Sequence, residues 1–78
     1  MGTPTVVKLS LNIAQHQVDT VRRIAEAQNI SMTEVIRHAI ALEAFVHDAH
    51  ADGSRIVIED KRGDKKLLVP VGNGWEPR

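Results

Sequence analysis

Three polar residues near the N-terminus, Lys8, Ser10 and Asn12, recur at every second position. Lysine donates hydrogen bonds, asparagine can donate and accept in a bidentate pair, and serine can do either. Side chains of these types can read the edges of DNA bases in the major groove. The same spacing is typical of the solvated face of any amphipathic strand, and from these residues alone that is the simpler interpretation. The interpretation that these residues contact DNA bases therefore depends on a second feature elsewhere in the sequence.

That second feature is the sequence Ser31-Met32-Thr33-Glu34. It matches a capping box, in which Ser31 accepts from an early helix amide and Glu34 accepts from the amide of Ser31. The first amides of a helix point outward and lie at the positive end of its dipole, so they can bind a phosphate oxygen. An ordinary helix cap is the alternative, and the two roles are compatible. Ser31, Met32 and Thr33 are thus candidate DNA phosphate contacts.

The net charge of the chain is zero, with ten Lys plus Arg and ten Asp plus Glu in 78 residues. No global field therefore draws the protein toward a polyanion. The charges are unevenly spread, since residues 31–54 are acidic whereas residues 1–30 and 55–78 carry more cations than anions. Any contact with a polyanion must be local. Arg22 and Arg23 are candidates for contacts to DNA phosphates, although a solvated helix face explains them equally well.

Length and composition exclude several other classes of protein. A chain of 78 residues makes one domain at most, and without cysteine it has neither disulfides nor a thiolate metal site. His47 and His50 are spaced for two metal ligands on one helix face, but no third ligand is evident, and no catalytic motif occurs. We therefore expect no enzyme activity, cofactor or metal. With no apolar run of membrane length and no signal peptide, we expect a cytoplasmic protein, nucleoid-associated when bound to DNA.

The periodicity of apolar residues predicts the elements that must position the candidate residues. Val7, Leu9, Leu11 and Ile13 alternate with polar residues, which predicts a strand over about residues 6–13. The period then changes to that of a helix over about residues 15–28, and Asn29 suits its left-handed end. A second helix is predicted over about residues 31–51. Residues 1–52 would form the first domain.

The remaining residues predict a β-hairpin and a tail. Residues 55–59 and 65–69 have strand composition, and Gly63 is placed for the left-handed position of the bulged turn that joins them. Pro70 should prevent the second strand from acting as a central strand of a sheet. The hairpin extension then covers residues 53–71, and residues 72–78 are expected to form a flexible tail that contains Trp75.

The predicted N-terminal strand needs a partner, because its backbone amides and carbonyls cannot stay unpaired against an apolar face. It could pair with the C-terminal hairpin of its own chain. It could instead pair with the same strand of a second copy, across a two-fold axis. The short link to the first helix and the broad apolar arc of the second favour pairing between two copies.

The stretches Val7–Ile13 and Asn29–Ile40 resemble the ribbon-helix-helix family of Arc/MetJ/CopG-type repressors. The similarity spans about residues 6–46, and Ile30-Ser-x-Thr-Glu-Val-Ile-Arg-x-Ala-Ile40 is its most specific part. One departure is Ala14, a poor N-cap where the family usually has a capping residue. The resemblance implies a mainly α fold with short β, in which an intermolecular two-stranded antiparallel ribbon joins an intertwined homodimer.

The resemblance also implies a function and a dimer core. The ribbon would lie in the major groove of double-stranded DNA, with Lys8, Ser10 and Asn12 on the bases and the start of the second helix on a phosphate, and repression of transcription would follow. Dimers could assemble further on DNA. The residues expected in the dimer core are Val7, Leu9, Leu11, Val18, Val21, Val35, Ile36, Ala39 and Ile40.

The predicted hairpin leaves an alternative function open. One of its faces carries Ile56, Ile58 and Leu68, and the other carries Val57, Leu67 and Val69, so that both are apolar. Folding back on the second helix would cover one face. The alternative is an antitoxin-like or assembly protein whose main partner is another protein bound through residues 55–69. A third option is a monomeric domain with no nucleic-acid role.

Overall fold

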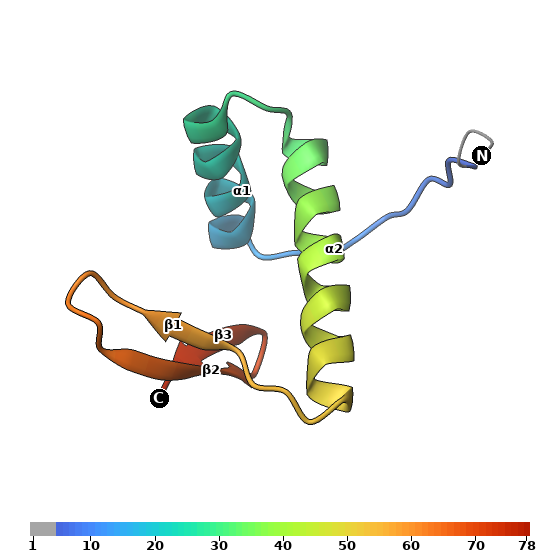
Figure 1. Ribbon diagram of the computed structural model, residues 1–78. Coiled ribbons are helices and arrows are strands. Elements are labelled where there is room, and N and C mark those ends of the chain that lie inside the picture. Colours follow the sequence, from blue (N-terminus) through green and yellow to red (C-terminus); the bar gives the residue numbers. More distant parts are fainter. Residues whose placement is uncertain (1–4) are drawn as a thin grey trace. The chain divides into compact units, whose positions relative to one another are not determined.

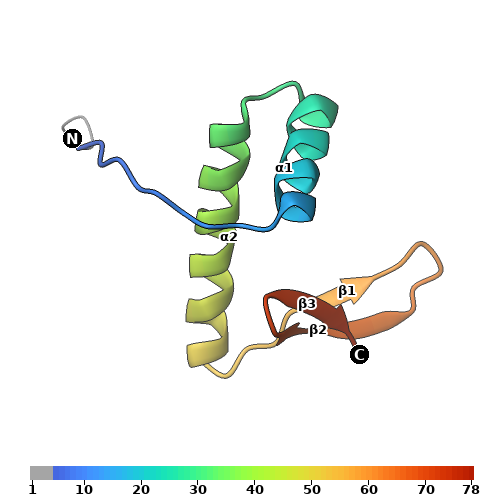
Figure 2. The same ribbon diagram turned by 180° about the vertical axis from the view of Figure 1, so that it is seen from behind.

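The computed structural model describes residues 5–78 and contains two helices and a three-stranded antiparallel sheet, a mixed α and β architecture (Figures 1 and 2). The chain divides into two compact units, residues 1–36 and 37–78, and the division falls inside the second helix. The elements in chain order are α1 (Gln15–Gln28), α2 (Met32–Ala51), β1 (Val57–Glu59), β2 (Lys65–Val71) and β3 (Gly74–Pro77).

Helix α1 covers the range predicted from the sequence, and Asn29 ends it in the left-handed conformation (φ 55°, ψ 47°). The amide of Ile30 donates to the carbonyl of Ala25 at 3.0 Å, and the amide of Asn29 donates to that of Glu26 at 3.3 Å. This pair of bonds is a Schellman motif, which satisfies carbonyls that a helix end otherwise leaves open. The connection to α2 is therefore defined by local hydrogen bonds.

The other end of α1 is capped more weakly. Ala14 is the N-cap and has no side-chain acceptor, so the first amides of the helix lack a side-chain partner there. Gln17 supplies only the reverse half of a capping box, accepting from the Ala14 amide at 3.0 Å. Alanine at the N-cap position, noted in the sequence, therefore leaves the start of α1 with only half of a capping box.

The turn between β1 and β2 is organised by Asp60. Its Oδ1 accepts from the backbone amides of Arg62 at 2.8 Å and Asp64 at 3.1 Å. Gly63 has φ +88° and donates from its amide to the Asp60 carbonyl at 3.1 Å. The left-handed conformation expected of Gly63 in a bulged hairpin is confirmed, and residues with a Cβ rarely adopt it.

The C-terminal residues form a third strand and not the flexible tail expected for residues 72–78. β3 pairs with the second half of β2, whereas β1 pairs with its first half, which places β2 in the middle of the sheet. The connection is a two-residue turn, Gly72-Asn73, with φ +57° at Gly72. Glycine at the first central position is the requirement of a type II′ hairpin, so a local signal for this strand exists in the sequence.

Pro70 lies within β2, although the sequence analysis excluded a central strand there. Leu67 and Arg78 exchange two backbone hydrogen bonds of 2.7 Å. Because such pairs alternate with non-hydrogen-bonded pairs, the Pro70–Trp75 pair is of the second kind and the proline nitrogen faces away from β3. On that side the last backbone bond runs from the Leu68 amide to the Ile56 carbonyl, before Pro70 is reached. The missing N–H of Pro70 therefore costs no ladder bond.

Few side chains are buried in the single chain. Among the described residues, the buried apolar ones are Ala25, Val35 and Val46, and no side chain is completely enclosed. Ala25 and Val35 belong to the first unit and Val46 to the second. Large apolar side chains remain exposed on α2, among them Ile40 (63%) and Phe45 (70%). One copy of the chain thus leaves uncovered much of the apolar surface that a stable core would bury.

We expect Asp60→Ala to lower the free energy of unfolding by about 1 kcal/mol, because two backbone amides lose their acceptor at an exposed turn. Asp60→Asn keeps an acceptor oxygen and is the matched control, with a smaller loss. Urea unfolding followed by the fluorescence of Trp75, the single tryptophan, measures both changes. Equal losses for the two variants would contradict the role assigned to the acceptor.

Candidate nucleic-acid interface

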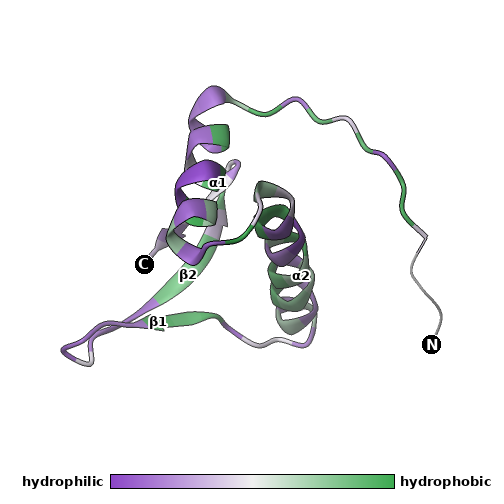
Figure 3. Cartoon of the chain, turned by 90° about the horizontal axis from the view of Figure 1, so that it is seen from above, coloured by the Kyte–Doolittle hydropathy of each residue, from purple (hydrophilic) through white to green (hydrophobic). Residues whose placement is uncertain are grey.

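The segment that carries Lys8, Ser10 and Asn12 has no regular secondary structure over residues 5–14 of the single chain. Apolar and polar residues alternate along it, as Figure 3 shows. Its apolar residues are largely exposed, with Val7 and Leu9 at 77% and Leu11 at 62%. The strand expected over residues 6–13 is thus not formed within one chain, and the described sheet consists of β1, β2 and β3 alone.

Lys8, Ser10 and Asn12 are all exposed. Among the described residues no hydrogen bond or ion pair joins their side chains to the rest of the chain. Their donors and acceptors are therefore available to a ligand. In an extended backbone these side chains point to one face, while Val7, Leu9 and Leu11 point to the other.

The start of α2 has the capping box expected from the sequence. The hydroxyl of Ser31 accepts from the Glu34 amide at 3.0 Å, and a carboxylate oxygen of Glu34 accepts from the Ser31 amide at 3.3 Å. In the described part of the chain, the amides of Met32 and Thr33 have no hydrogen-bond acceptor. Two adjacent amides at the positive end of a helix can bind one anionic oxygen, such as that of a phosphate.

The two arginines of α1 differ in their surroundings. Arg22 lies 3.4 Å from Asp19, one turn earlier on the helix, and both side chains are more than half exposed. Such a surface pair contributes little to stability, so Arg22 can exchange it for a phosphate at small cost. Arg23 is exposed and makes no ion pair among the described residues. Both remain candidates for phosphate contacts.

The residues expected in a dimer core fall into two groups. Val35 is buried (7% exposed), and Val18, Val21 and Ile36 are partly buried, so the helical members pack at least in part within one chain. Ala39 and Ile40, like Val7, Leu9 and Leu11, are exposed. The single chain therefore brings together only the members contributed by α1 and the first turn of α2.

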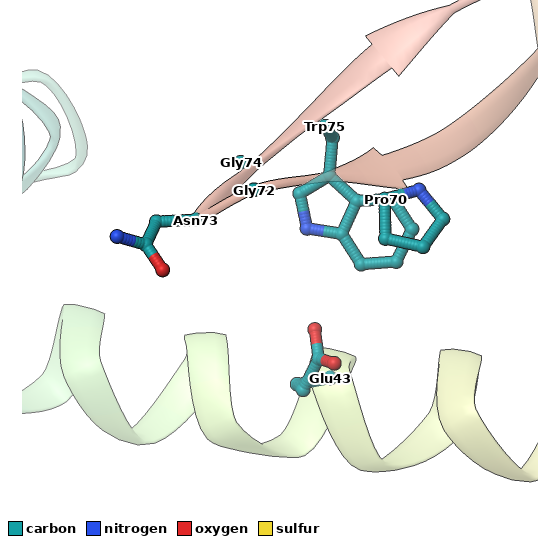
Figure 4. Close-up of a pocket in the computed structure, with 6 residues that line it drawn as sticks. All are labelled: Glu43, Pro70, Gly72, Asn73, Gly74 and Trp75. Carbon is teal, nitrogen blue, oxygen red and sulfur yellow. The ribbon is translucent and has the colours of Figure 1, made fainter.

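Sequence analysis missed the surroundings of Trp75. In β3 its ring centroid lies 6.5 Å from that of His50 on α2. Trp75 and Glu43 line a cavity of about 270 Å³ together with Pro70 and the turn residues (Figure 4). Glu43 on α2 is exposed, and its carboxylate points toward the side of β3 that carries Trp75. Recognising the Gly72-Asn73 hairpin would have placed Trp75 on a strand.

Two other kinds of feature are absent from the described residues, a metal-binding cluster and a membrane-spanning helix. In residues 5–78 no group of three or more His, Asp or Glu side chains is gathered as a metal site would require. No helix in the same range has the length and hydropathy needed to span a membrane.

Comparisons of this chain with protein-family models, with curated proteins and with solved structures gave no match.

We expect Ser31→Ala to lower the free energy of unfolding by about 1 kcal/mol, because the Glu34 amide loses its acceptor. Thr33→Ala removes a hydroxyl that has no hydrogen-bond partner among the described residues and should change stability by less than about 0.5 kcal/mol. Thermal unfolding followed by circular dichroism compares the two. If Thr33→Ala lowers the free energy of unfolding as much as Ser31→Ala does, the loss in Ser31→Ala cannot be assigned to the helix cap.

Proposed function

We propose that this protein is a sequence-specific DNA-binding transcriptional regulator that acts as a repressor. Two copies pair through residues 6–13 in a two-stranded antiparallel ribbon, and the ribbon enters the major groove. Lys8, Ser10 and Asn12 contact bases. The amides of Met32 and Thr33 contact a phosphate on the flanking backbone, with Ser31, Arg22 and Arg23 close to the same strand of DNA.

One observation carries the proposal: residues 7, 9 and 11 expose 77%, 77% and 62% of their surface, in strict alternation with hydrogen-bonding residues. Burying three such side chains in each copy is worth about 1.5–3 kcal/mol per side chain. Pairing also satisfies backbone groups that have no partner among the described residues. A two-fold ribbon covers the apolar face and leaves the face of Lys8, Ser10 and Asn12 open to a ligand.

The start of α2 supports the same proposal independently. Its capping box occupies the amides of Ser31 and Glu34 and leaves those of Met32 and Thr33 open. A phosphate bound there would orient the protein on DNA without reading sequence, while the ribbon supplies the base contacts. The segment before α2 carries few anions, since within residues 1–30 they are Asp19 and Glu26.

We expect Lys8→Ala and Asn12→Ala each to weaken binding to the operator about tenfold or more, because a bidentate base contact is worth about 1–3 kcal/mol. Gel shifts on DNA from upstream of the protein's own gene measure the change. Lys61→Ala, in the turn between β1 and β2, removes one positive charge elsewhere and is the matched control. If both variants bind this DNA as tightly as the wild type, the proposed role of the segment is wrong.

We also expect a shallow dependence of DNA affinity on salt. The logarithm of the binding constant falls by about 0.9 per neutralised phosphate for each unit of log salt concentration. With zero net charge and few cations near the ribbon, few phosphates are neutralised by each copy. Titrations at several salt concentrations give the slope, and a slope as steep as that of strongly basic proteins would mean that the lysines of the C-terminal sheet also contact DNA.

A further inference from the structure

The two outer strands of the C-terminal sheet differ in how well they are protected against pairing with another chain. β1 and β3 each have one neighbour, so each presents an open edge. On β3 the residues with outward backbone groups are Trp75 and Pro77, because they form the non-hydrogen-bonded pairs with β2. Pro77 has no N–H to donate there, which protects this edge. β1 contains no proline.

The open edge of β1 presents the backbone groups of three residues. The amide of Leu68 donates to the carbonyl of Ile56 at 2.8 Å, which identifies the hydrogen-bonded pairs between β1 and β2. Because hydrogen-bonded and non-hydrogen-bonded residues alternate along a strand, Ile58 also bonds to β2. The backbone N–H and C=O groups of Arg55, Val57 and Glu59 therefore point away from β2, to the open edge. Val57 and Glu59 form the non-hydrogen-bonded pairs with β2, so their amides face away from it, and the Arg55 amide makes no backbone hydrogen bond to any other described residue.

The sequence of this edge is complementary to itself. Residues 55–59 read Arg-Ile-Val-Ile-Glu, an apolar palindrome with opposite charges at its ends. Two antiparallel copies centred on Val57 place Val57 opposite Val57 and Arg55 opposite Glu59 of the other copy. In this register the Val57–Val57 pair and the two Arg55–Glu59 pairs join residues whose backbone N–H and C=O groups are free. Each of these pairs can therefore exchange two N–H···O bonds.

We propose that the β1 edge is a self-pairing interface, at which residues 55–59 of two copies form an antiparallel pair centred on Val57. The two sheets then join into one continuous sheet of twice the width. Each Arg55 guanidinium faces a Glu59 carboxylate of the other copy, and in its own chain Glu59 already lies opposite Lys65. The result is a row of alternating charges across the sheet, which selects this register over a shifted one.

The interface is separate from the proposed ribbon of residues 6–13 and does not depend on it. Two different two-fold interfaces on one chain link dimers into tetramers or longer rows. If both exist, β1 pairing connects ribbon dimers. If only β1 pairing exists, the protein is a dimer through its C-terminal sheet.

Charge reversal provides the test. Arg55→Glu or Glu59→Arg alone places like charges opposite each other at both ends of the interface, and the dissociation constant should rise by about tenfold or more. An equimolar mixture of the two variants restores opposite charges at both ends and should recover the wild-type mass. The double variant R55E/E59R should also recover it. Sedimentation equilibrium of the full chain gives the masses, and Lys61→Glu, in the adjacent turn, is the control.

The predicted outcome does not depend on the ribbon. At protein concentrations near the wild-type dissociation constant, the single variants should shift the mass toward that of the ribbon dimer if the ribbon exists, and toward that of the monomer if it does not. Single variants with the wild-type mass, or a mixture that stays at the reduced mass, would overturn the proposal. Single variants with the wild-type mass are the result expected if a different protein occupies the edge.

A cross-linking experiment tests the register without disturbing charge. The chain has no cysteine, so Val57→Cys introduces a single thiol. Facing residues of a hydrogen-bonded pair have Cα atoms about 5.5 Å apart, within disulfide range. In Ile58→Cys the two thiols would lie beyond about 7 Å and on the opposite face, so mild oxidation should cross-link only the first variant. Equal cross-linking of both variants would contradict the register.

Discussion

The apolar surface that one copy of this chain cannot cover is the constraint on which the rest of its architecture depends. The buried apolar residues of the described range are Ala25, Val35 and Val46, and the exposed ones include Val7, Leu9 and Leu11. A domain stabilised mainly by apolar burial needs more than this. The proposed ribbon would bury part of this exposed apolar surface. Because the apolar side chains alternate with the polar ones, burying them against a second copy leaves the polar side chains facing DNA.

Local hydrogen bonding, in contrast, is well satisfied in each element. Schellman bonds follow the end of α1 at Gln28. The amides of Gly53 and Ser54 donate to the carbonyls of His50 and Ala49 beyond the end of α2 at Ala51. Ser31 and Glu34 cap the start of α2, and Asp60 holds the turn of the first hairpin. Each element is therefore well defined before any packing between copies. Because caps and turns fix the backbone locally, the open amides at the start of α2 are held in place even though the core is small.

Proline placement distinguishes the edges of the sheet. Pro70 and Pro77 both occupy positions whose nitrogen faces away from the pairing strand, so the sheet tolerates them. Pro77 also limits what can pair with the outer side of β3. β1 has no such protection and carries a self-complementary sequence of charges. The positions of the prolines and the proposed pairing of β1 thus have the same physical basis, which is whether a backbone N–H at the sheet edge has a hydrogen-bond partner.

The sequence by itself determined the elements whose signals are local: the helix over residues 15–28, its left-handed end at Asn29, the cap at Ser31 and the left-handed Gly63. These depend on hydrogen bonds between residues a few positions apart, so residue type and spacing suffice to predict them. The candidate residues Lys8, Ser10 and Asn12 were likewise identified from spacing, and the structure shows them exposed. The strand at residues 74–77 has a local signal in the Gly72-Asn73 turn, but only the tertiary structure decided that β2 pairs on both sides through different halves and that Trp75 lies near His50. Strand pairing is chosen by which edge has free backbone groups, and that choice becomes visible only when the strands are placed side by side.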